Sequence, residues 1–339
     1  MAWWNPDAFE KVRPNLKQRM LVIRTVRRFL DFYDFDEVDT PILQVSPCAE
    51  AHLHGFKTEL LGADLEAKSE LYLHTSPEFA MKKLLVAGMD KIFQISHVFR
   101  NGEGSSLHSP EFMMVEWYRA RASYVDIMED CVRLLRYISD KMELNSFSYK
   151  QHVSDPHGKW NNLSVVEAFD RYADIDLVSV LNSTKKFASV AKEACVRVTE
   201  EDGWSDIFHA VMAEKIEPNL GVGTPTILYD YPVSEAALAQ VKRDDKRFAE
   251  RFELYVCGME LANAFGELTD AREQRKRYRA QMKLKKELYG QEYPIDEDFL
   301  KALEYGMPRS AGIALGLDRL AMLASGADHI ENVLWCGQL

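Results

Sequence analysis

Residues 91–120 read KIFQISHVFRNGEGSSLHSPEFMMVEWYRA and predict two β-strands joined by a long polar loop. Closely spaced apolar side chains mark a first strand that ends at Phe99, and the run 112–118 marks a second strand. The residues between them are mainly Asn, Gly, Ser, His and Pro, which are typical of loops. The stretch therefore predicts an antiparallel hairpin around which the rest of the chain is organised.

One carboxylate of this hairpin is expected in an apolar setting. Strand alternation places four side chains on the same face, namely Phe112, Met114, Glu116 and Tyr118. A buried carboxylate without a partner is costly or becomes protonated, so we expect a cation opposite Glu116. Arg100 or Arg119 could supply it from within the chain, and a cationic ligand is the alternative.

The composition indicates a globular protein without a membrane segment. The chain has 339 residues, of which 47% are apolar, so it can bury a large core. No apolar run approaches the length of a membrane span, and the first residues lack the features of a signal peptide. We therefore expect a cytoplasmic protein. Its five cysteines are far apart and form no CxxC pair, which indicates neither a disulfide framework nor a zinc site.

The charge distribution gives no general attraction for nucleic acid. The formal net charge is −11 at pH 7. One local basic patch occurs at residues 272–286, where eight of fifteen residues are Lys or Arg. A solvated helix face and a docking site for an acidic partner are both open interpretations of this patch.

The other elements are expected to be a mixture of helices and strands. Apolar residues at three- and four-residue steps predict helices over 15–33 and 124–142. A short strand over 36–43 contains Pro41, and residues 71–85 predict a strand, a turn and a helix. Ser164 and Glu167 form a capping box, and further helices are expected over 177–196 and 205–217, so the region of about 120–220 is interpreted as a helical insertion. Strands follow at 226–231, 252–257 and 310–317, and Asp318 is expected to cap a helix over 319–324.

Two groups of residues near the C-terminus suggest binding chemistry. Asn263, Phe265 and Glu267 fall at i, i+2 and i+4, so one strand face presents an amide, a ring and a carboxylate that suit an aliphatic ammonium. Glu253 and Glu260 flank a turn, and two close carboxylates repel each other unless a cation such as Mg²⁺ joins them. Simple solvent exposure of these acids is the alternative.

Three segments together resemble the class II aminoacyl-tRNA synthetases, and most closely the lysyl type. Phe99-Arg100-Asn101, the run 108–112 and Glu116-Trp117-Tyr118 resemble motif 2. The helix, strand and proline near the N-terminus resemble motif 1, which builds a homodimer interface in that family. GLDRL at 316–320 resembles motif 3. The resemblance covers residues 13–335 and implies one catalytic domain of α+β fold, with an antiparallel sheet flanked by helices. It also implies activation of a carboxylate with ATP as an acyl-adenylate.

The resemblance also implies roles for individual residues. Arg100 and Arg319 would be catalytic, and Glu253 and Glu260 would hold Mg²⁺. The residues implied at ATP are Arg100, Asn101, Gly102, Glu103, His108, Ser109, Phe112, Glu260, Leu261, Gly316 and Arg319. The residues implied at the amino acid are Ser76, Pro77, Glu78, Glu116, Tyr118, Asn263, Phe265, Glu267 and Ala314. Motif 2 usually runs Arg-Asn-Glu, whereas here Gly102 intervenes and the acid is Glu103.

Two features favour one branch of the family. About 12 residues precede the core, too few for the OB-fold that reads the anticodon in lysyl-tRNA synthetases, so we expect no such domain and no tRNA. Ala314 stands where those enzymes usually have Gly, which trims the pocket against α-lysine. Both features resemble the elongation factor P–lysine ligases, which move a lysyl group, typically (R)-β-lysine, onto a lysine of elongation factor P. A minimal lysyl-tRNA synthetase and an inactive paralogue that acts as a binding module are the alternatives.

Overall fold

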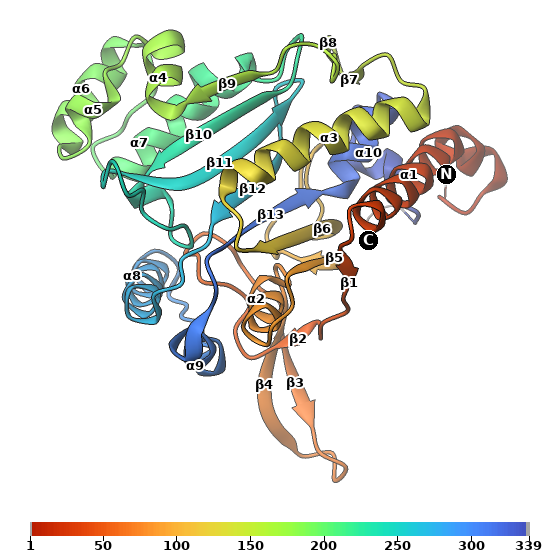
Figure 1. Cartoon of the computed structure of the whole chain (residues 1–339), viewed down its shortest axis with the longest axis horizontal. Helices are drawn as coiled ribbons and strands as arrows, with labels where there is room; N and C mark the ends of the chain where they lie inside the picture. The colour runs from red at the N-terminus through yellow and green to blue at the C-terminus, as the bar shows by residue number, and fades with distance from the viewer. Residues whose placement is uncertain (1, 337–339) are drawn as a thin grey trace.

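An eight-stranded sheet forms the centre of the computed structural model, which describes residues 2–336 (Figure 1). Its strand order is β1-β5-β6-β13-β12-β11-β10-β9. The strands are β1 (Asp36–Glu37), β5 (Lys91–Phe99), β6 (Glu111–Ala120), β9 (Asn161–Ser164), β10 (Thr226–Pro232), β11 (Phe248–Val256), β12 (Met259–Gly266) and β13 (Ser310–Gly316). All neighbouring pairs are antiparallel except the two at the edges, β1 with β5 and β9 with β10. The expected α+β fold is confirmed, and the sheet is mixed at its edges.

The hairpin expected at 91–120 is confirmed as β5 and β6. Lys91 pairs with Arg119 and Phe99 with Glu111, so the strands match over their whole length. Alternation along β6 is confirmed as well, because Val115 and Trp117 lie in the main apolar core while Tyr118 packs on the opposite side of the sheet.

Three helices cover one face of the sheet and enclose the main core, namely α1 (Pro6–Phe32), α3 (Tyr124–Met142) and α10 (Leu317–Ser325) (Figure 1). The helix predicted over 15–33 begins earlier, because Asn5 caps it by accepting from the backbone N–H groups of Asp7 and Ala8. The helices α2 (Glu78–Val86), α8 (Ala271–Tyr289) and α9 (Glu297–Gly306) form a second apolar cluster on the other side.

Residues 143–225 contain helices and three short strands. The elements are β7 (Phe147–Tyr149), β8 (His152–Ser154), β9, α4 (Val165–Ala173), α5 (Leu177–Val180), α6 (Thr184–Glu193), α7 (Trp204–Val211), η1 (Met212–Ile216) and η2 (Glu217–Asn219). The capping box of Ser164 and Glu167 is confirmed at the start of α4. The helix predicted over 177–196 is two helices, since Ser183 caps a new one. The helices α4–α7 pack around Phe169, Phe187 and Phe208, and β9 joins the main sheet.

A small sheet projects away from the main body (Figure 1). It consists of β2 (Leu43–Gln44), β3 (Lys57–Leu61) and β4 (Ala67–Leu73) in the order β2-β4-β3. The strand predicted over 36–43 is therefore divided between two sheets at Pro41, which has no backbone N–H to donate. Two 3₁₀ turns, η3 (Val233–Glu235) and η4 (Ile330–Val333), complete the elements. No helix within residues 2–336 is long and apolar enough to cross a membrane.

Candidate active site

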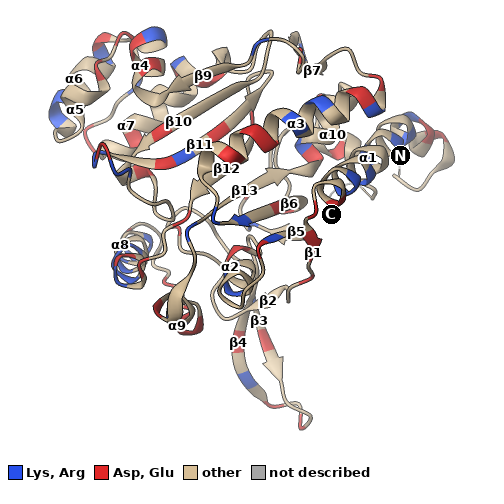
Figure 2. Ribbon diagram, viewed as in Figure 1, with Lys and Arg blue, Asp and Glu red and all other residues tan. Residues whose placement is uncertain are grey.

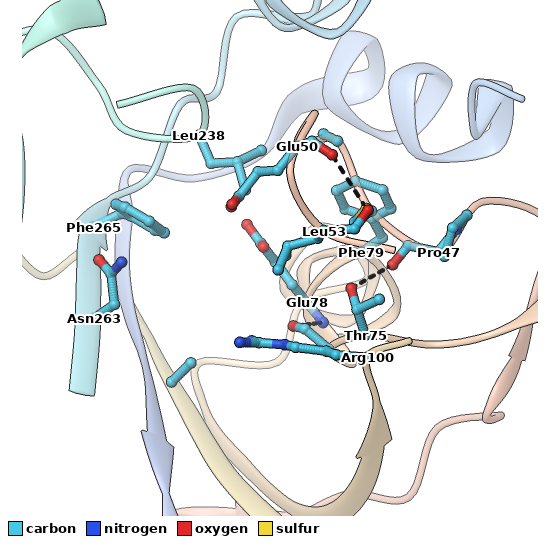
Figure 3. Close-up of a pocket in the computed structure, with 14 residues that line it drawn as sticks. Pro47, Glu50, Leu53, Thr75, Glu78, Phe79, Arg100, Leu238, Asn263 and Phe265 are labelled. Carbon is cyan, nitrogen blue, oxygen red and sulfur yellow. Dashed lines mark hydrogen bonds between the residues drawn. The ribbon is translucent and has the colours of Figure 1, made fainter. Parts of the chain in front are cut away.

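A small pocket, here called the inner pocket, lies beside the strands β12 and β13 and has a volume of about 90 Å³ (Figure 3). Its walls come from three places: the loop at 47–53, the start of α2, and the sheet. The lining residues are Pro47, Cys48, Ala49, Glu50, Leu53, Thr75, Ser76, Glu78, Phe79, Arg100, Leu238, Asn263, Phe265 and Ala314. Figure 3 shows Glu78 and Arg100 on one side and Asn263 and Phe265 on the opposite wall.

Glu116 lies buried next to this pocket, and its partners are hydroxyl groups. Ser76 Oγ donates to Oε1 at 2.5 Å and the Tyr118 hydroxyl donates to Oε2 at 2.8 Å. Burial raises the pKa of Glu116 to about 7, although the hydrogen bond from Ser76 opposes the rise. The expectation of a salt bridge to Arg100 or Arg119 is wrong, because Arg119 pairs with Asp130 on α3 and Arg100 lies nearer Glu103. The other expectation, a cationic ligand opposite Glu116, stays a prediction.

Glu267 and Glu78 share a buried lysine that the sequence did not single out. Lys82 Nζ lies 2.5 Å from Glu267 Oε2 and forms a second ion pair with Glu78, one turn earlier on α2. Burial alone would lower the pKa of Lys82, but the two carboxylates outweigh it and raise the pKa. Burial raises the pKa of Glu267 to about 8 in spite of Lys82. The spacing of Glu78 and Lys82 at i and i+4 was a sequence signal for one of these pairs.

These four residues, Glu78, Glu116, Glu267 and Lys82, are here called the acid cluster. They carry three negative charges and one positive charge when ionised, so the cluster has an excess of two negative charges. Glu116, Glu267 and Lys82 are buried and do not line the inner pocket, while Glu78 does. These three side chains therefore lie behind the part of the pocket wall that Ser76 and Glu78 form.

Gly312 allows the acid cluster to assemble. It pairs with Tyr118 across β13 and β6, and a Cβ at this position would lie 2.2 Å from the Tyr118 ring and 2.7 Å from Glu267 Oε1. Any larger residue would push apart two side chains of the predicted amino-acid site.

A larger cavity, here called the wide cavity, joins the inner pocket at Arg100, Asn263 and Ala314, which line both. Its volume is about 350 Å³, within the range of small-molecule sites. The predicted ATP residues Arg100, Glu103, His108, Ser109, Phe112, Glu260, Leu261, Gly316 and Arg319 all line it. The predicted nucleotide residues therefore gather in one place, with two exceptions. Asn101 and Gly102 are exposed and do not line it.

Two arginines are held at this cavity by different contacts. The guanidinium of Arg319 donates to the backbone oxygen of Glu260 at 2.7 Å and lies 2.6 Å from His108 Nε2. The pKa of His108 is lowered, first by burial and then by the positive charge of Arg319. The guanidinium of Arg100 lies 5.2 Å from the centre of the Phe112 ring. Its Nε atom has no acceptor among the described residues, so it can receive an anion.

Glu253 and Glu260 face the wide cavity together, which the strand register explains. Glu253 pairs with Asn263 and Tyr255 pairs with Glu260, with an irregularity in the ladder between them. Glu253 accepts from the hydroxyls of Tyr231 and Tyr255 at 2.6 Å and from Arg251. The pKa of Glu260 is raised to about 7, first by its enclosure and then by the charge of Glu253. Carboxylate oxygens are suitable ligands for a hard cation such as Mg²⁺, although Arg251 is paired with Glu253 and Arg319 lies 3.8 Å from Glu260.

The expected helix cap at Asp318 is wrong. The helix α10 begins at Leu317 and has no side-chain cap. Asp318 is buried, and its carboxylate accepts from Arg19 Nε on α1 and from the backbone N–H of Met113, both at 2.7 Å. It therefore joins motif 3 to the first helix and to β6.

The sequence matches one protein family over almost its whole length. The sequence model of the family described as tRNA synthetases class II (D, K and N) matches residues 8–337. The chain belongs to this family. It is 36% identical over 334 residues to the elongation factor P--(R)-beta-lysine ligase of Edwardsiella ictaluri (strain 93-146). That alignment covers 98% of this chain and 97% of the relative.

Membership in the class II synthetase family agrees with the arrangement of motifs 2 and 3. Motif 2 is the hairpin β5–β6, motif 3 begins at the end of β13, and both line the wide cavity. The roles of the individual residues stay predictions. Pro77 is buried outside both cavities, and Tyr118 reaches the site only through the acid cluster.

Proposed function

We propose that this protein uses ATP to activate (R)-β-lysine as an acyl-adenylate and then transfers the lysyl group to a lysine side chain of elongation factor P. The acid cluster is the observation that carries the proposal. When all four groups are ionised, the cluster has an excess of two negative charges beside the inner pocket, and the two ammonium groups of lysine or β-lysine would favour these ionised forms of Glu116 and Glu267. The name of the relative supports the choice of isomer and acceptor.

The activation step is explained by positioning and charge neutralisation. The substrate ammonium groups lie toward the acid cluster, and the substrate carboxylate lies at Arg100, whose Nε atom needs an acceptor. Arg100 lines both cavities, so it can contact the carboxylate and the α-phosphate of ATP at once. Arg319 and Phe112 are available to the adenine, and Mg²⁺ held by Glu253 and Glu260 would neutralise phosphate charge.

The preference for β-lysine is assigned to Ala314. This residue pairs with Glu116 on one side and with Asn263 on the other, so its methyl group lies at the junction of the two cavities. A methyl group at this point narrows the space next to the substrate carboxylate. One methyl group changes discrimination by about 1–3 kcal/mol, so it sets a preference between isomers.

We also propose a cytoplasmic homodimer. In this family motif 1 forms the dimer interface, and the corresponding segment has exposed apolar side chains, namely Met20, Leu21, Ile42, Leu43 and Val45. Light scattering of the purified protein tests this, and a monomer at micromolar concentration would contradict it.

Intact-mass spectrometry of elongation factor P from the same organism tests the main proposal. The factor is incubated with the protein, ATP, Mg²⁺ and either α-lysine or (R)-β-lysine, beside a tRNA charging reaction. One added lysyl mass on the factor, larger with β-lysine, and uncharged tRNA are expected. Charged tRNA with an unmodified factor would instead indicate a minimal lysyl-tRNA synthetase, and no product in either reaction would indicate a binding module.

A further inference from the structure

A third cavity, here called the side cavity, meets the other two and has a volume of about 520 Å³. Asn263 and Glu50 line all three cavities, so the three spaces converge at these residues. The lining residues of the side cavity are Glu50, Ala51, His52, Ser205, Asp206, His209, Ser234, Glu235, Ala237, Leu238, Arg251, Asn263, Phe265, Gln281 and Leu284.

The point of convergence is where the acyl-adenylate would form. The inner pocket would hold the amino acid and the wide cavity the nucleotide, so the reactive carbonyl would lie between them near Arg100 and Asn263. A nucleophile that attacks this carbonyl has to arrive from a third direction, because both other spaces are filled by the adenylate. The side cavity supplies that direction.

The walls of the side cavity suit a ligand that is cationic and rich in hydrogen-bond donors. Three carboxylates line it, those of Glu50, Asp206 and Glu235, and the one guanidinium, of Arg251, is already paired with Glu253. Glu235 is 8% exposed, and its Oε1 atom has no donor among the described residues. The Oδ1 atom of Asn263 likewise accepts no hydrogen bond from any residue within 2–336. A protonated amine is a donor that oxygens of this kind can accept from.

We propose that the side cavity is the passage through which the acceptor, a primary amine on a protein side chain, reaches the acyl-adenylate. This inference rests on the proposed function and adds the route and the residues that receive the amine. Glu235 attracts the ammonium, and His209 takes its first proton. His209 Nε2 lies 3.7 Å from Glu235 Oε2, so the carboxylate stabilises the imidazolium that forms.

The transfer step that follows conserves atoms and charge. The neutral nitrogen bonds to the carbonyl carbon of the adenylate, the bond between that carbon and the phosphate oxygen breaks, and AMP leaves with the electron pair. The second proton of the nitrogen goes to solvent. The products are an amide on the acceptor, AMP and two protons.

Two half-reactions measured side by side test the passage. Lysine-dependent exchange of pyrophosphate into ATP reports adenylate formation, and the mass of elongation factor P reports transfer. Hydroxylamine is a small neutral nucleophile that needs neither attraction by a carboxylate nor loss of a first proton, so its capture of the adenylate is a third readout.

The variants are Glu235→Gln, His209→Gln and Ser234→Trp. Ser234 is exposed and lines only this cavity, so a tryptophan there obstructs the passage without disturbing the core. We expect transfer to fall by about tenfold for Glu235→Gln, with exchange and hydroxylamine capture within about twofold of the unmodified protein. His209 also lines the wide cavity, so the readout for His209→Gln is the ratio of transfer to hydroxylamine capture, which should fall by about a hundredfold. Glu214→Gln, an exposed acid just after α7 that lines no described cavity, is the matched control and should leave all three readouts unchanged.

Other outcomes overturn the inference in distinguishable ways. Unchanged transfer in both Ser234→Trp and Glu235→Gln would show that the acceptor enters elsewhere. A raised KM for lysine in the exchange reaction would show that the side cavity admits the amino acid instead. Absence of lysine-dependent exchange in the unmodified protein would contradict the proposed function itself, whatever the variants do.

Discussion

Lys82 Nζ lies 2.5 Å from Glu267 Oε2 in the interior of the protein, and neither side chain is more than 1% exposed. The two residues come from α2 and from the end of β12, 185 positions apart in the chain. This ion pair places a cation of the protein beside the predicted substrate site. It reduces the negative charge of the acid cluster to the amount that two substrate ammonium groups can neutralise.

Lys82→Met should destabilise the protein by about 3–5 kcal/mol, because it leaves the buried carboxylate of Glu267 and the partly buried one of Glu78 without their cation. Lysine-dependent adenylate formation should be lost as well. Urea denaturation and pyrophosphate exchange measure the two effects. Lys83→Met is the matched control, since Lys83 is partly exposed and pairs with Asp296 and Asp298, and its cost should be about 1 kcal/mol or less. A stable and active Lys82→Met variant would show that the cluster has no need of this cation.

Glu116→Gln should abolish most lysine-dependent adenylate formation while sparing the fold. The amide keeps the size of the side chain, and its oxygen can accept from one of the hydroxyls of Ser76 and Tyr118 while its NH2 group donates to the other, but it removes the negative charge next to the inner pocket. Pyrophosphate exchange and circular dichroism test this. Glu267→Gln should also lose activity, with an added loss of stability because Lys82 stays buried. Retained activity in both variants would contradict the assignment of the pocket.

The raised pKa of Glu116 predicts how stability depends on pH. Its ordinary pKa of 4.5 rises to about 7 in the fold. Between these values the unfolded chain has released the proton and the folded chain still holds it, so the free energy of unfolding falls as the pH rises. Glu116→Gln lacks this titration, so its stability relative to the unmodified protein should improve by about 2–3 kcal/mol from pH 4.5 to pH 8. Urea denaturation at both pH values measures the difference, and a constant difference would contradict the assignment.

Lysine binding should show the opposite dependence on pH. The ionised form of Glu116 binds an ammonium group, so affinity for lysine should increase as the pH rises through about 7. Isothermal titration of the protein with lysine from pH 6 to pH 8 measures this trend. Glu116→Gln is the control, and its weaker binding should vary less over the same range.

Ala314→Gly should shift the preference of the enzyme toward α-lysine by about tenfold, because it removes one methyl group at the junction of the inner pocket and the wide cavity. The ratio of kcat/KM for the two isomers in pyrophosphate exchange measures the shift. Ala311→Gly is the matched control on the same strand, since Ala311 faces the main core on the other side of the sheet. An unchanged ratio in Ala314→Gly would show that this methyl group is not the basis of selectivity between the two isomers.

The basic patch at 272–286 is reduced to one stripe in the folded protein. Figure 2 shows Lys and Arg positions along α8 in blue. Five of these cations are exposed and recur at helical spacing, namely Arg272, Lys276, Arg279, Lys283 and Lys286. Lys276, Lys283 and Lys286 of this stripe pair with Glu273, Glu287 and Glu292. Of the other cations, Arg275 and Arg277 are ion-paired, and Lys285 is buried against the backbone of Ala51 and Leu53. Charge reversal by Arg272→Glu with Arg279→Glu should slow transfer to elongation factor P without slowing adenylate formation. Equal rates would identify the stripe as a solvated helix face.

Local patterns in the sequence were sufficient for much of the fold. Alternating apolar residues predicted β5 and β6, helical spacing predicted α3 over its full length, and Ser164 with Glu167 predicted the start of α4. These features depend on residues a few positions apart, whose periodicity and capping chemistry are present in the chain before it folds. The motifs likewise indicated most residues of the wide cavity.

Only the tertiary structure decided how the charges of the site are paired. Asp318 accepts from Arg19, 299 positions away, rather than capping its own helix, and Lys82 joins two acids from different elements. The side cavity also depends on the packing of α7, α8 and the loop at 50–52, which are distant in sequence. Periodicity reports which face of an element is buried and leaves open which residues meet there, because that depends on the register and packing of segments far apart in the chain.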